Sequence, residues 1–114
     1  MPGFLVVFPR CSVAVENVNM AVLLRFTVTS ADQGRFDELD ARVEQVLSQA
    51  GGPPAGLMVH VVYSEGDRFV VAGVWRTEAE GLHYVDGVLR PLLDELGLTA
   101  EATTISSVWS FARP

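Results

Sequence analysis

The sequence predicts an α+β fold, and two stretches of it carry that prediction. Residues 69–75 are apolar at every position, which is typical of a strand that is covered on both faces. Residues 82–96 repeat apolar side chains at three- and four-residue steps, which is typical of an amphipathic helix. A helix of this kind buries one face, so a strand that leads directly into it predicts a sheet with helices packed against it.

The length of 114 residues and the 49% of apolar residues are sufficient for one core but not for two. We expect residues 1–20 to form an N-terminal arm and residues 21–114 to form the domain, because Met20 directly precedes the first regular pattern. Within the arm, Phe4 to Phe8 would form a short apolar strand that ends at Pro9. A free strand of this kind promotes aggregation, so we expect it to add to a sheet edge or to cross to a partner subunit.

Residues 22–29 alternate between two faces and predict the first strand of the domain. Ser30 and Gln33 then match a capping box at the start of a helix. The glycines and prolines of residues 51–56 predict a loop after this helix. The inward stripe of the helix is expected to comprise Phe36, Leu39, Val43, Val46, Leu47 and Ala50.

Residues 57–64 predict the second strand. The turn residues 65–67 join it, as a hairpin, to the third strand, which is expected to end at Arg76. Residues 103–111 are rich in threonine and aromatic side chains and predict the last strand.

The second helix lies between the third and the last strand. Thr77 and Glu80 match a capping box at its start, and Gly97 supplies a left-handed residue at its end. Pro91 lacks an amide hydrogen and clashes with the preceding turn. We therefore expect a kink or break in this helix at residues 88–90.

The order of elements is thus β-α-β-β-α-β, the ferredoxin-like arrangement of an antiparallel sheet with both helices on one face. The other face would expose apolar side chains, among them Leu23, Met58, Val62, Phe69, Val71 and Trp75. We expect the sheet of a second copy to cover this face, which would make the protein a homodimer and a dimeric α+β barrel.

Composition argues against several classes of function. The net charge is −6 and the eight basic residues are scattered, which argues against a nucleic acid or a membrane surface as the partner. No apolar run reaches the roughly 18 residues that span a bilayer. The single cysteine, Cys11, fits a reducing cytoplasm, where we expect the protein to reside. The two histidines lack an acidic cluster at ligand spacing, so we expect no metal site. The glycines match no nucleotide-binding motif, so we expect no cofactor.

Side-chain size indicates which residues line the interior of the expected barrel. Val70, Ala72 and Val74 are small enough to lie beneath helices, which would place the alternate residues of the strand on the opposite face. We expect that opposite face to form an apolar small-molecule pocket. Its expected lining residues are Phe69, Val71, Gly73 and Trp75, joined by Arg25, Thr27, Met58, His60 and Val62.

Three of these residues have chemical roles to offer, each with a structural alternative. His60 could exchange a proton near neutral pH, or it could be hydrogen-bonded within the barrel wall. Arg25 could stabilise an enolate oxygen, or it could pair with an acidic neighbour. Trp75 could stack on a planar ligand, or it could pack in the core. His83 is expected at the surface.

The runs PPAGLMVHVV, VVAGVW-RTEAEG and VLRPLLDELG resemble the dimeric α+β-barrel superfamily that includes the antibiotic biosynthesis monooxygenases, and especially its small uncharacterised actinobacterial members. The resemblance covers about residues 21–112. The signature of a strand that ends in tryptophan, followed by a polar pair and a helix start, is matched by Val74, Trp75, Arg76, Thr77 and Glu78.

This resemblance implies cofactor-free oxidation of a polycyclic aromatic, in which O₂ reacts at a substrate carbanion that hydrogen bonds in the pocket stabilise. Trp75 and His60 are the positions that match. Val71 stands where those enzymes place an asparagine, and Gly73 and Trp109 stand where the small members show an acidic residue and a histidine.

Two functions follow from the sequence. The first is an enzyme that acts on a hydrophobic aromatic or polyketide-like metabolite: a cofactor-free monooxygenase, or a related oxidase, isomerase or cyclase of secondary metabolism. Its catalytic residues would be His60 as general base and Arg25 as oxyanion partner. Its substrate-binding residues would be Trp75, Phe69, Val71, Gly73, Met58, Trp109 and Thr27. The second function is a non-catalytic ligand-binding or structural dimer in which the same residues form core.

Overall fold

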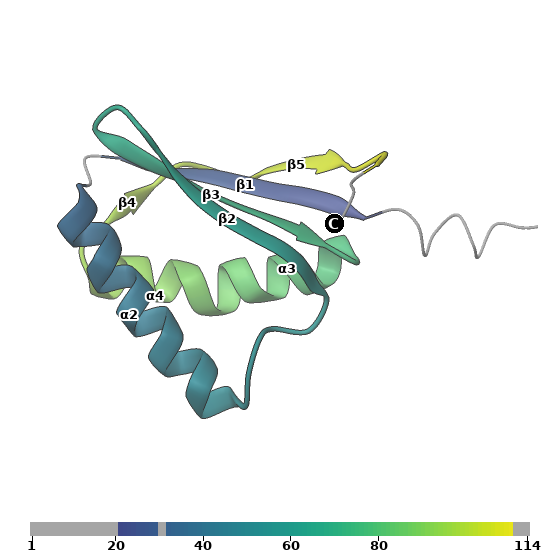
Figure 1. Cartoon of the computed structure of the whole chain (residues 1–114), viewed down its shortest axis with the longest axis horizontal. Coiled ribbons are helices and arrows are strands. Elements are labelled where there is room, and N and C mark those ends of the chain that lie inside the picture. The colour runs from purple at the N-terminus through teal and green to yellow at the C-terminus, as the bar shows by residue number, and fades with distance from the viewer. Residues whose placement is uncertain (1–20, 30–31, 111–114) are drawn as a thin grey trace, which may run out of the picture.

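The computed structural model describes residues 21–29 and 32–110, which form one antiparallel sheet with helices on one face (Figure 1). The strands are β1 Val22–Thr29, β2 Leu57–Glu65, β3 Arg68–Trp75, β4 Thr99–Ala100 and β5 Thr104–Ser107. The helical segments are α2 Gln33–Ala50, α3 Glu78–Tyr84, the π-helical η1 Val85–Leu89 and α4 Arg90–Glu95. The predicted ferredoxin-like α+β fold is confirmed. The N-terminal arm, with its predicted strand from Phe4 to Phe8, lies outside the described residues.

The sheet follows the order β2-β3-β1, and both β4 and β5 pair with the far side of β1. The predicted last strand, residues 103–111, corresponds to β5, which ends earlier than expected, at Ser107, and β4 is an additional short strand within the connection predicted at residues 98–102. Arg90 of α4 donates hydrogen bonds between these two strands, to the carbonyl of Glu101 (3.0 Å) and to Oγ1 of Thr103 (2.8 Å). Phe111, the expected last residue of the strand, lies outside the described residues.

Helix α2 begins two residues later than the predicted capping box placed it, because its N-cap is at position 32 rather than 30. Asp32 is its N-cap and accepts a hydrogen bond from the amide of Arg35 at 3.0 Å. The side chain of Gln33 donates instead to Asp37, so the proposed pairing of Ser30 with Gln33 is wrong; Ser30 itself lies outside the described residues. Ala50, expected on the inward stripe, is exposed.

The second helix matches its predicted limits, and a π turn at Val85–Leu89 takes the place of the kink or break expected at residues 88–90. Oγ1 of Thr77 accepts a hydrogen bond from the amide of Glu80 at 3.2 Å, and Gly97 has φ +71°. The amide of Arg90 bonds to the carbonyl of Val85, five residues back, so η1 is a π turn. Pro91 explains this, because an α-helical Pro91 would clash with the carbonyl of Gly87 and leave it without a donor.

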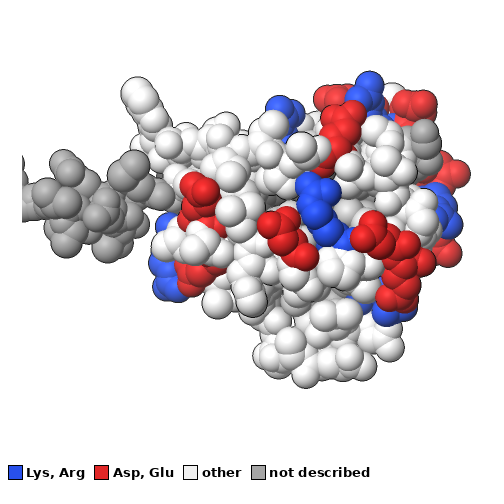
Figure 2. All heavy atoms as spheres, turned by 180° about the vertical axis from the view of Figure 1, so that it is seen from behind, with Lys and Arg blue, Asp and Glu red and all other residues white. Residues whose placement is uncertain are grey.

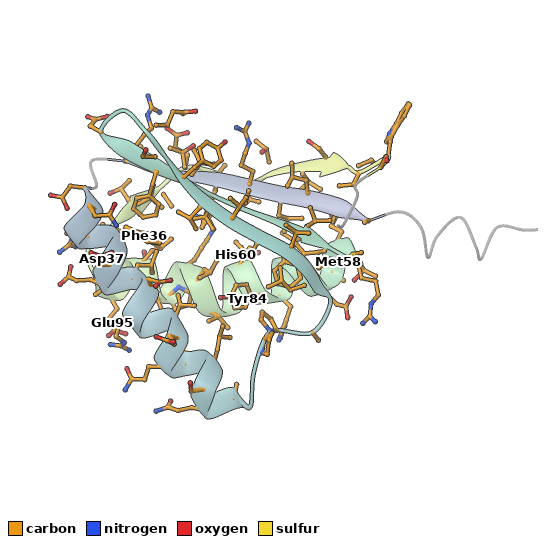
Figure 3. The ribbon with its side chains drawn as sticks, in the orientation of Figure 1. Phe36, Asp37, Met58, His60, Tyr84 and Glu95 are labelled. Atoms are coloured by element: carbon orange, nitrogen blue, oxygen red, sulfur yellow. The ribbon has the colours of Figure 1, made fainter. Side chains whose placement is uncertain are left out.

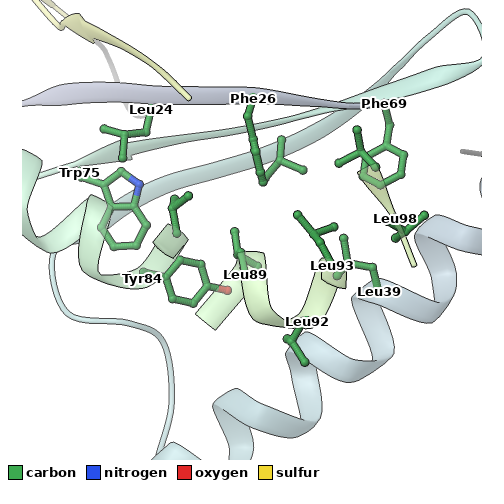
Figure 4. Packing of buried hydrophobic residues seen from close by; sticks show 13 residues of the cluster. Leu24, Phe26, Leu39, Phe69, Trp75, Tyr84, Leu89, Leu92, Leu93 and Leu98 are labelled. Carbon is green, nitrogen blue, oxygen red and sulfur yellow. The ribbon is translucent and has the colours of Figure 1, made fainter. Parts of the chain in front are cut away.

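The core lies between the sheet and the helices, as Figure 4 shows. From the sheet it includes Leu24, Phe26, Val28, Phe69, Val71 and Trp75, and from the helices Leu39, Tyr84, Val85, Leu89, Leu92 and Leu93. The face assignment from side-chain size is therefore wrong: the large residues of β3 face the helices, and Val70, Ala72 and Val74 face away. The large side chains fill the space beneath the helices, which the small ones would leave empty.

Two glycines let the backbone come close to Trp75 in this core. A Cβ atom on Gly73 would lie 2.8 Å from Nε1 of Trp75, and one on Gly81 would lie 2.9 Å from both Trp75 and Leu24. Neither contact is tolerated in a packed interior. Strand β3 and helix α3 can therefore enclose the indole from two sides.

Helix α2 is held most closely between Arg35 and Arg42, whereas Val43, Val46 and Leu47 are only partly buried against the core. Arg35 donates to the carbonyl of Leu96, Arg42 pairs with Glu95, and Leu39 is buried. Toward Ala50 the helix diverges from the sheet, and the loop that follows returns to β2 (Figure 1). The divergence leaves an opening between α2 and the rest of the domain.

Candidate functional site

The opening beside α2 consists of three connected hollows, which we call the α2 cleft. An inner hollow of about 30 Å³ lies deepest and is lined mostly by core residues such as Phe26, Leu39 and Val71. A central groove of about 380 Å³ continues from it and shares His60 and Tyr84 with it. An outer groove of about 480 Å³ lies between α2, the 51–56 loop and α3. Leu47, Pro53 and Pro54 line both grooves, Val43 lines the central one and Val46 lines the outer one.

His60 comes into the cleft from β2, an edge strand. Its register partner is Gly73, on the helix side of the sheet, and Figure 3 shows His60 on that side, near Tyr84. His60 is accessible to solvent, but the cleft encloses its ring in part. This partial burial lowers the pKa of the imidazole, because it disfavours the charged ring more than the negative charge of Asp40 favours it. At neutral pH His60 is therefore an uncharged proton acceptor.

Tyr84 reaches the cleft from the end of α3 and lines all three hollows. Its ring is buried and packs on Trp75, with the ring centres 5.5 Å apart. Burial raises the pKa of its hydroxyl, so the phenol keeps its proton at neutral pH and can donate a hydrogen bond. Among the described residues, neither Tyr84 nor His60 has a side-chain hydrogen-bond partner. The alternative of a hydrogen-bonded wall histidine therefore finds no support there.

Arg25 and Thr27 do not reach this cleft with their side chains. Arg25 is paired in register with Ala72 and Thr27 with Val70, which places both on the open face of the sheet, away from the helices. The expected grouping of Arg25 with His60 is wrong, because successive residues of a strand point to opposite faces. Arg25 is exposed and makes no ion pair with another described residue. The alternative that Arg25 pairs with an acidic neighbour therefore finds no support among the described residues.

The other predicted lining residues are dispersed. Trp75 is only 2% exposed and packs in the core, so its packing alternative describes it best. Val71 lines the inner hollow, Gly73 lies over Trp75, and Phe69 packs edge-on against Phe36 at 5.4 Å. Met58 is half-buried at a bulge of β2, and Trp109 is 96% exposed beyond β5. His83 is exposed at the outer groove, as expected.

Sequence reasoning missed Tyr84 and Asp40, which face His60 from two different helices. For Tyr84 a signal existed: it lies one turn before Val88 and next to Val85, on the edge of the apolar stripe. For Asp40 there was none, because it lies among the charged residues of the outer face of α2 and reaches the cleft only through the tilt of that helix.

A larger hollow of about 600 Å³ lies at the start of α2 and is lined by Asp32, Gln33, Ser64, Asp67 and Arg68, but by neither histidine nor Tyr84. The described residues contain no group of three metal-binding side chains, and none of their helices is long and apolar enough to cross a membrane. On the face seen in Figure 2, arginines and acidic residues are interspersed rather than separated into patches of one sign. The α2 cleft is therefore the best candidate site in the part of the chain that the structure describes.

Known proteins resemble this chain in structure but not in sequence. No protein-family model and no curated protein matches the sequence. A variant of SnoaB, a cofactor-independent oxygenase from Streptomyces nogalater, matches with a TM-score of 0.55 at 14% identity, over 82% of this chain and 96% of that one. A protein of unknown function from Nitrosomonas europaea matches with a TM-score of 0.58 at 18% identity, over 84% and 97%.

A third structure is a candidate antibiotic biosynthesis monooxygenase from Chloroflexus aurantiacus, which matches with a TM-score of 0.56 at 13% identity, over 82% of this chain and 97% of that one. At such identities a structural likeness establishes the fold and leaves the activity open. The chain thus has the ferredoxin-like α+β fold of structures that include a cofactor-independent oxygenase and antibiotic biosynthesis monooxygenase-like proteins.

Proposed function

We propose that the α2 cleft binds a hydrophobic, aromatic or polyketide-like molecule and that His60 removes a proton from it. The observation that carries this proposal is the pairing of His60 and Tyr84, from different elements, in the same otherwise largely apolar hollows. An apolar cavity with a few convergent polar groups is the usual form of a small-molecule site. The shared fold with a cofactor-independent oxygenase supports an oxygenase reaction without a bound cofactor.

The chemistry assigns one role to each polar residue. The uncharged imidazole of His60 accepts a proton from an acidic C–H or phenolic O–H of the ligand. The hydroxyl of Tyr84 donates a hydrogen bond to the oxygen on which negative charge develops. The carboxylate of Asp40 stabilises the imidazolium that forms. The resulting anion is electron-rich enough for O₂ to oxidise it directly.

The test is oxygen consumption by the full chain with hydroxylated polycyclic aromatics as substrates. His60→Ala should lower turnover by about two to four orders of magnitude, the range for a lost general base, while the fold is retained. Asp94→Asn is the control, because Asp94 is exposed and lines none of the three hollows, and it should keep its activity. Equal turnover by the wild type and His60→Ala would contradict the proposal.

A non-catalytic binding protein is the second candidate, and one observation favours it. Arg25, the expected oxyanion partner, lies on the opposite face of the sheet, and Trp75, the expected stacking residue, is packed in the core, so neither lines the accessible grooves. In this case His60→Ala should bind the ligand with unchanged or weakened affinity, and no oxygen should be consumed.

We also propose that the protein acts in the cytoplasm as a homodimer that buries the open face of the sheet. The side chains of Val59, Val61 and Tyr63 on that face are 38%, 48% and 41% exposed. The sheet of a second copy would remove this apolar surface from water.

A further inference from the structure

The charges around the α2 cleft are of one sign. Asp40 and Glu44 line the central groove, and Glu80 lines the outer groove. Among the described residues, which include six of the eight arginines, no arginine lines any of the three hollows. The basic side chains that do line them are His60 and His83.

The two carboxylates of the central groove are not neutralised within the described part of the chain. Asp40 and Glu44 form no ion pair there, whereas Glu38 and Glu95, on or beside the same helix, are paired with Arg35 and Arg42. At the outer groove Glu80 is paired with Arg76 and accepts a hydrogen bond from Thr77. Within the cleft, the negative charge without an ion-pair partner therefore lies at the central groove, which His60 and Tyr84 also line.

We propose that the α2 cleft selects uncharged or cationic hydrophobic ring systems and rejects those that carry a carboxylate or a phosphate. This inference rests on the proposed function of the cleft and specifies its ligand class. An anionic ligand would lose part of its hydration and meet two carboxylates without a guanidinium or ammonium group to pair with. A cationic substituent would be attracted by the same two groups.

The polar groups of the cleft suit a hydroxyl group best. A ligand hydroxyl can donate its proton to His60 or Asp40 and can accept a hydrogen bond from the phenol of Tyr84. A ligand carboxylate can only accept, and Tyr84 is the one side chain of the three that can donate to it while His60 is uncharged. Phenolic polycycles therefore satisfy the cleft, and carboxylated ones leave its acceptors facing a like charge.

The experiment compares three anthracene derivatives with the same ring system, carrying a hydroxymethyl, an aminomethyl or a carboxylate group. Binding to the full chain is followed at neutral pH by the fluorescence of the anthracene. We expect the hydroxymethyl and aminomethyl compounds to bind, and the carboxylate to bind about tenfold more weakly because of like-charge repulsion. Raising the ionic strength should narrow this difference, because salt screens exposed charges.

A pair of charge-matched variants locates the cause. The double variant Asp40→Asn/Glu44→Gln should reduce the difference between the neutral and the carboxylate compound to less than about threefold. The control Asp37→Asn/Glu38→Gln removes the same charge from α2 at positions that do not line the cleft, and it should preserve the difference. All four residues are exposed, so both variants should fold.

The possible outcomes separate this inference from the proposed function. If the neutral compound binds and the carboxylate binds equally well, the charge selectivity is wrong while the cleft remains a binding site. A preference that persists in Asp40→Asn/Glu44→Gln also overturns the inference. If none of the three compounds binds, both the inference and the proposed function fail.

Discussion

At the scale of single residues, His60 and Tyr84 form a complementary pair because their surroundings favour the uncharged form of each. Burial lowers the pKa of the histidine and raises that of the tyrosine, so one accepts and the other donates a proton at neutral pH. Asp40 opposes the effect of burial on His60 from across the cleft. Residues of α2 and α3 thus surround His60, which β2 supplies, and the carboxylate from α2 affects its pKa.

This arrangement predicts how activity and stability depend on pH. The pKa of His60 lies below its ordinary value of 6.5, so protonation favours the unfolded chain. The uncharged form of His60 contributes fully to stability above pH 6.5, and this contribution is lost as the pH falls through the pKa of His60 in the folded state. The acid limb of the pH–rate profile should accordingly lie below pH 6.5, because catalysis needs the uncharged imidazole.

Asp40→Asn sharpens the test. Removing the carboxylate takes away the attraction that raises the pKa of His60, so the acid limb should move to still lower pH. Nuclear magnetic resonance titration of the imidazole C–H gives the same pKa without turnover. Asp37→Asn, on α2 but outside the cleft, should leave it unchanged. If the acid limb of Asp40→Asn moves to higher pH instead, the carboxylate of Asp40 does not raise the pKa of His60.

At the scale of elements, the π turn allows the second helix to accommodate Pro91 without losing its register on the core. One extra residue in the turn moves the hydrogen bond of Arg90 back to Val85 and places Leu92 and Leu93 against the sheet. The exposed Gly87 is in the middle of this turn, and nothing lies within 4 Å of where its Cβ would be.

Deletion of Gly87 tests this explanation. Without that residue the turn becomes α-helical, and Pro91 then occupies a helix interior, which costs about 3 kcal/mol. Deletion of Gly87 combined with Pro91→Ala restores an ordinary helix and should recover most of the lost stability. Urea denaturation of the wild type and both variants measures the difference. Equal stability of the two deletion variants would mean that Pro91 does not require the π turn.

The elements could be predicted from sequence because their signals are local. The cap at Thr77, the stop at Gly97 and the irregularity before Pro91 depend on neighbours in the chain. The faces of β3 could not be predicted in the same way, because residues 69–75 are apolar on both sides and alternation carries no information. The role of Asp40 in the cleft could not be predicted for a related reason. The orientation of α2, which places Asp40 near His60, depends on contacts between segments far apart in sequence, such as that of Arg35 with Leu96.

At the scale of the whole molecule, one face of the sheet carries the helices and the other is open. The fold is shared with the solved structures, whereas the homodimer is a proposal that follows from the open face. Val61 is well suited to test it, because it is 48% exposed in the single chain and its register partner on the open face is Ala72.

Val61→Asp should leave the single chain folded and prevent dimer formation. The charge remains hydrated in the monomer but would be buried without a partner between two sheets, at a cost of several kcal/mol. Ala41→Asp, at an exposed position of α2, adds the same charge away from that face and should leave the dimer intact. Sedimentation velocity at micromolar concentration distinguishes the outcomes. A wild type that sediments as a monomer would refute the dimer.

The one-sided attachment of α2 gives that helix the geometry of a lever. Its pivot lies near Arg35, Leu39 and Arg42, and its free end lies at Ala50, beside the outer groove. At a rise of about 1.5 Å per residue, a rotation of about 10° at Arg42 moves the far end by about 2 Å while the pivot stays in place. Val46 and Leu47, which line the outer groove, are only partly buried against the core at this end of the helix, so the width of the groove depends on the angle of α2.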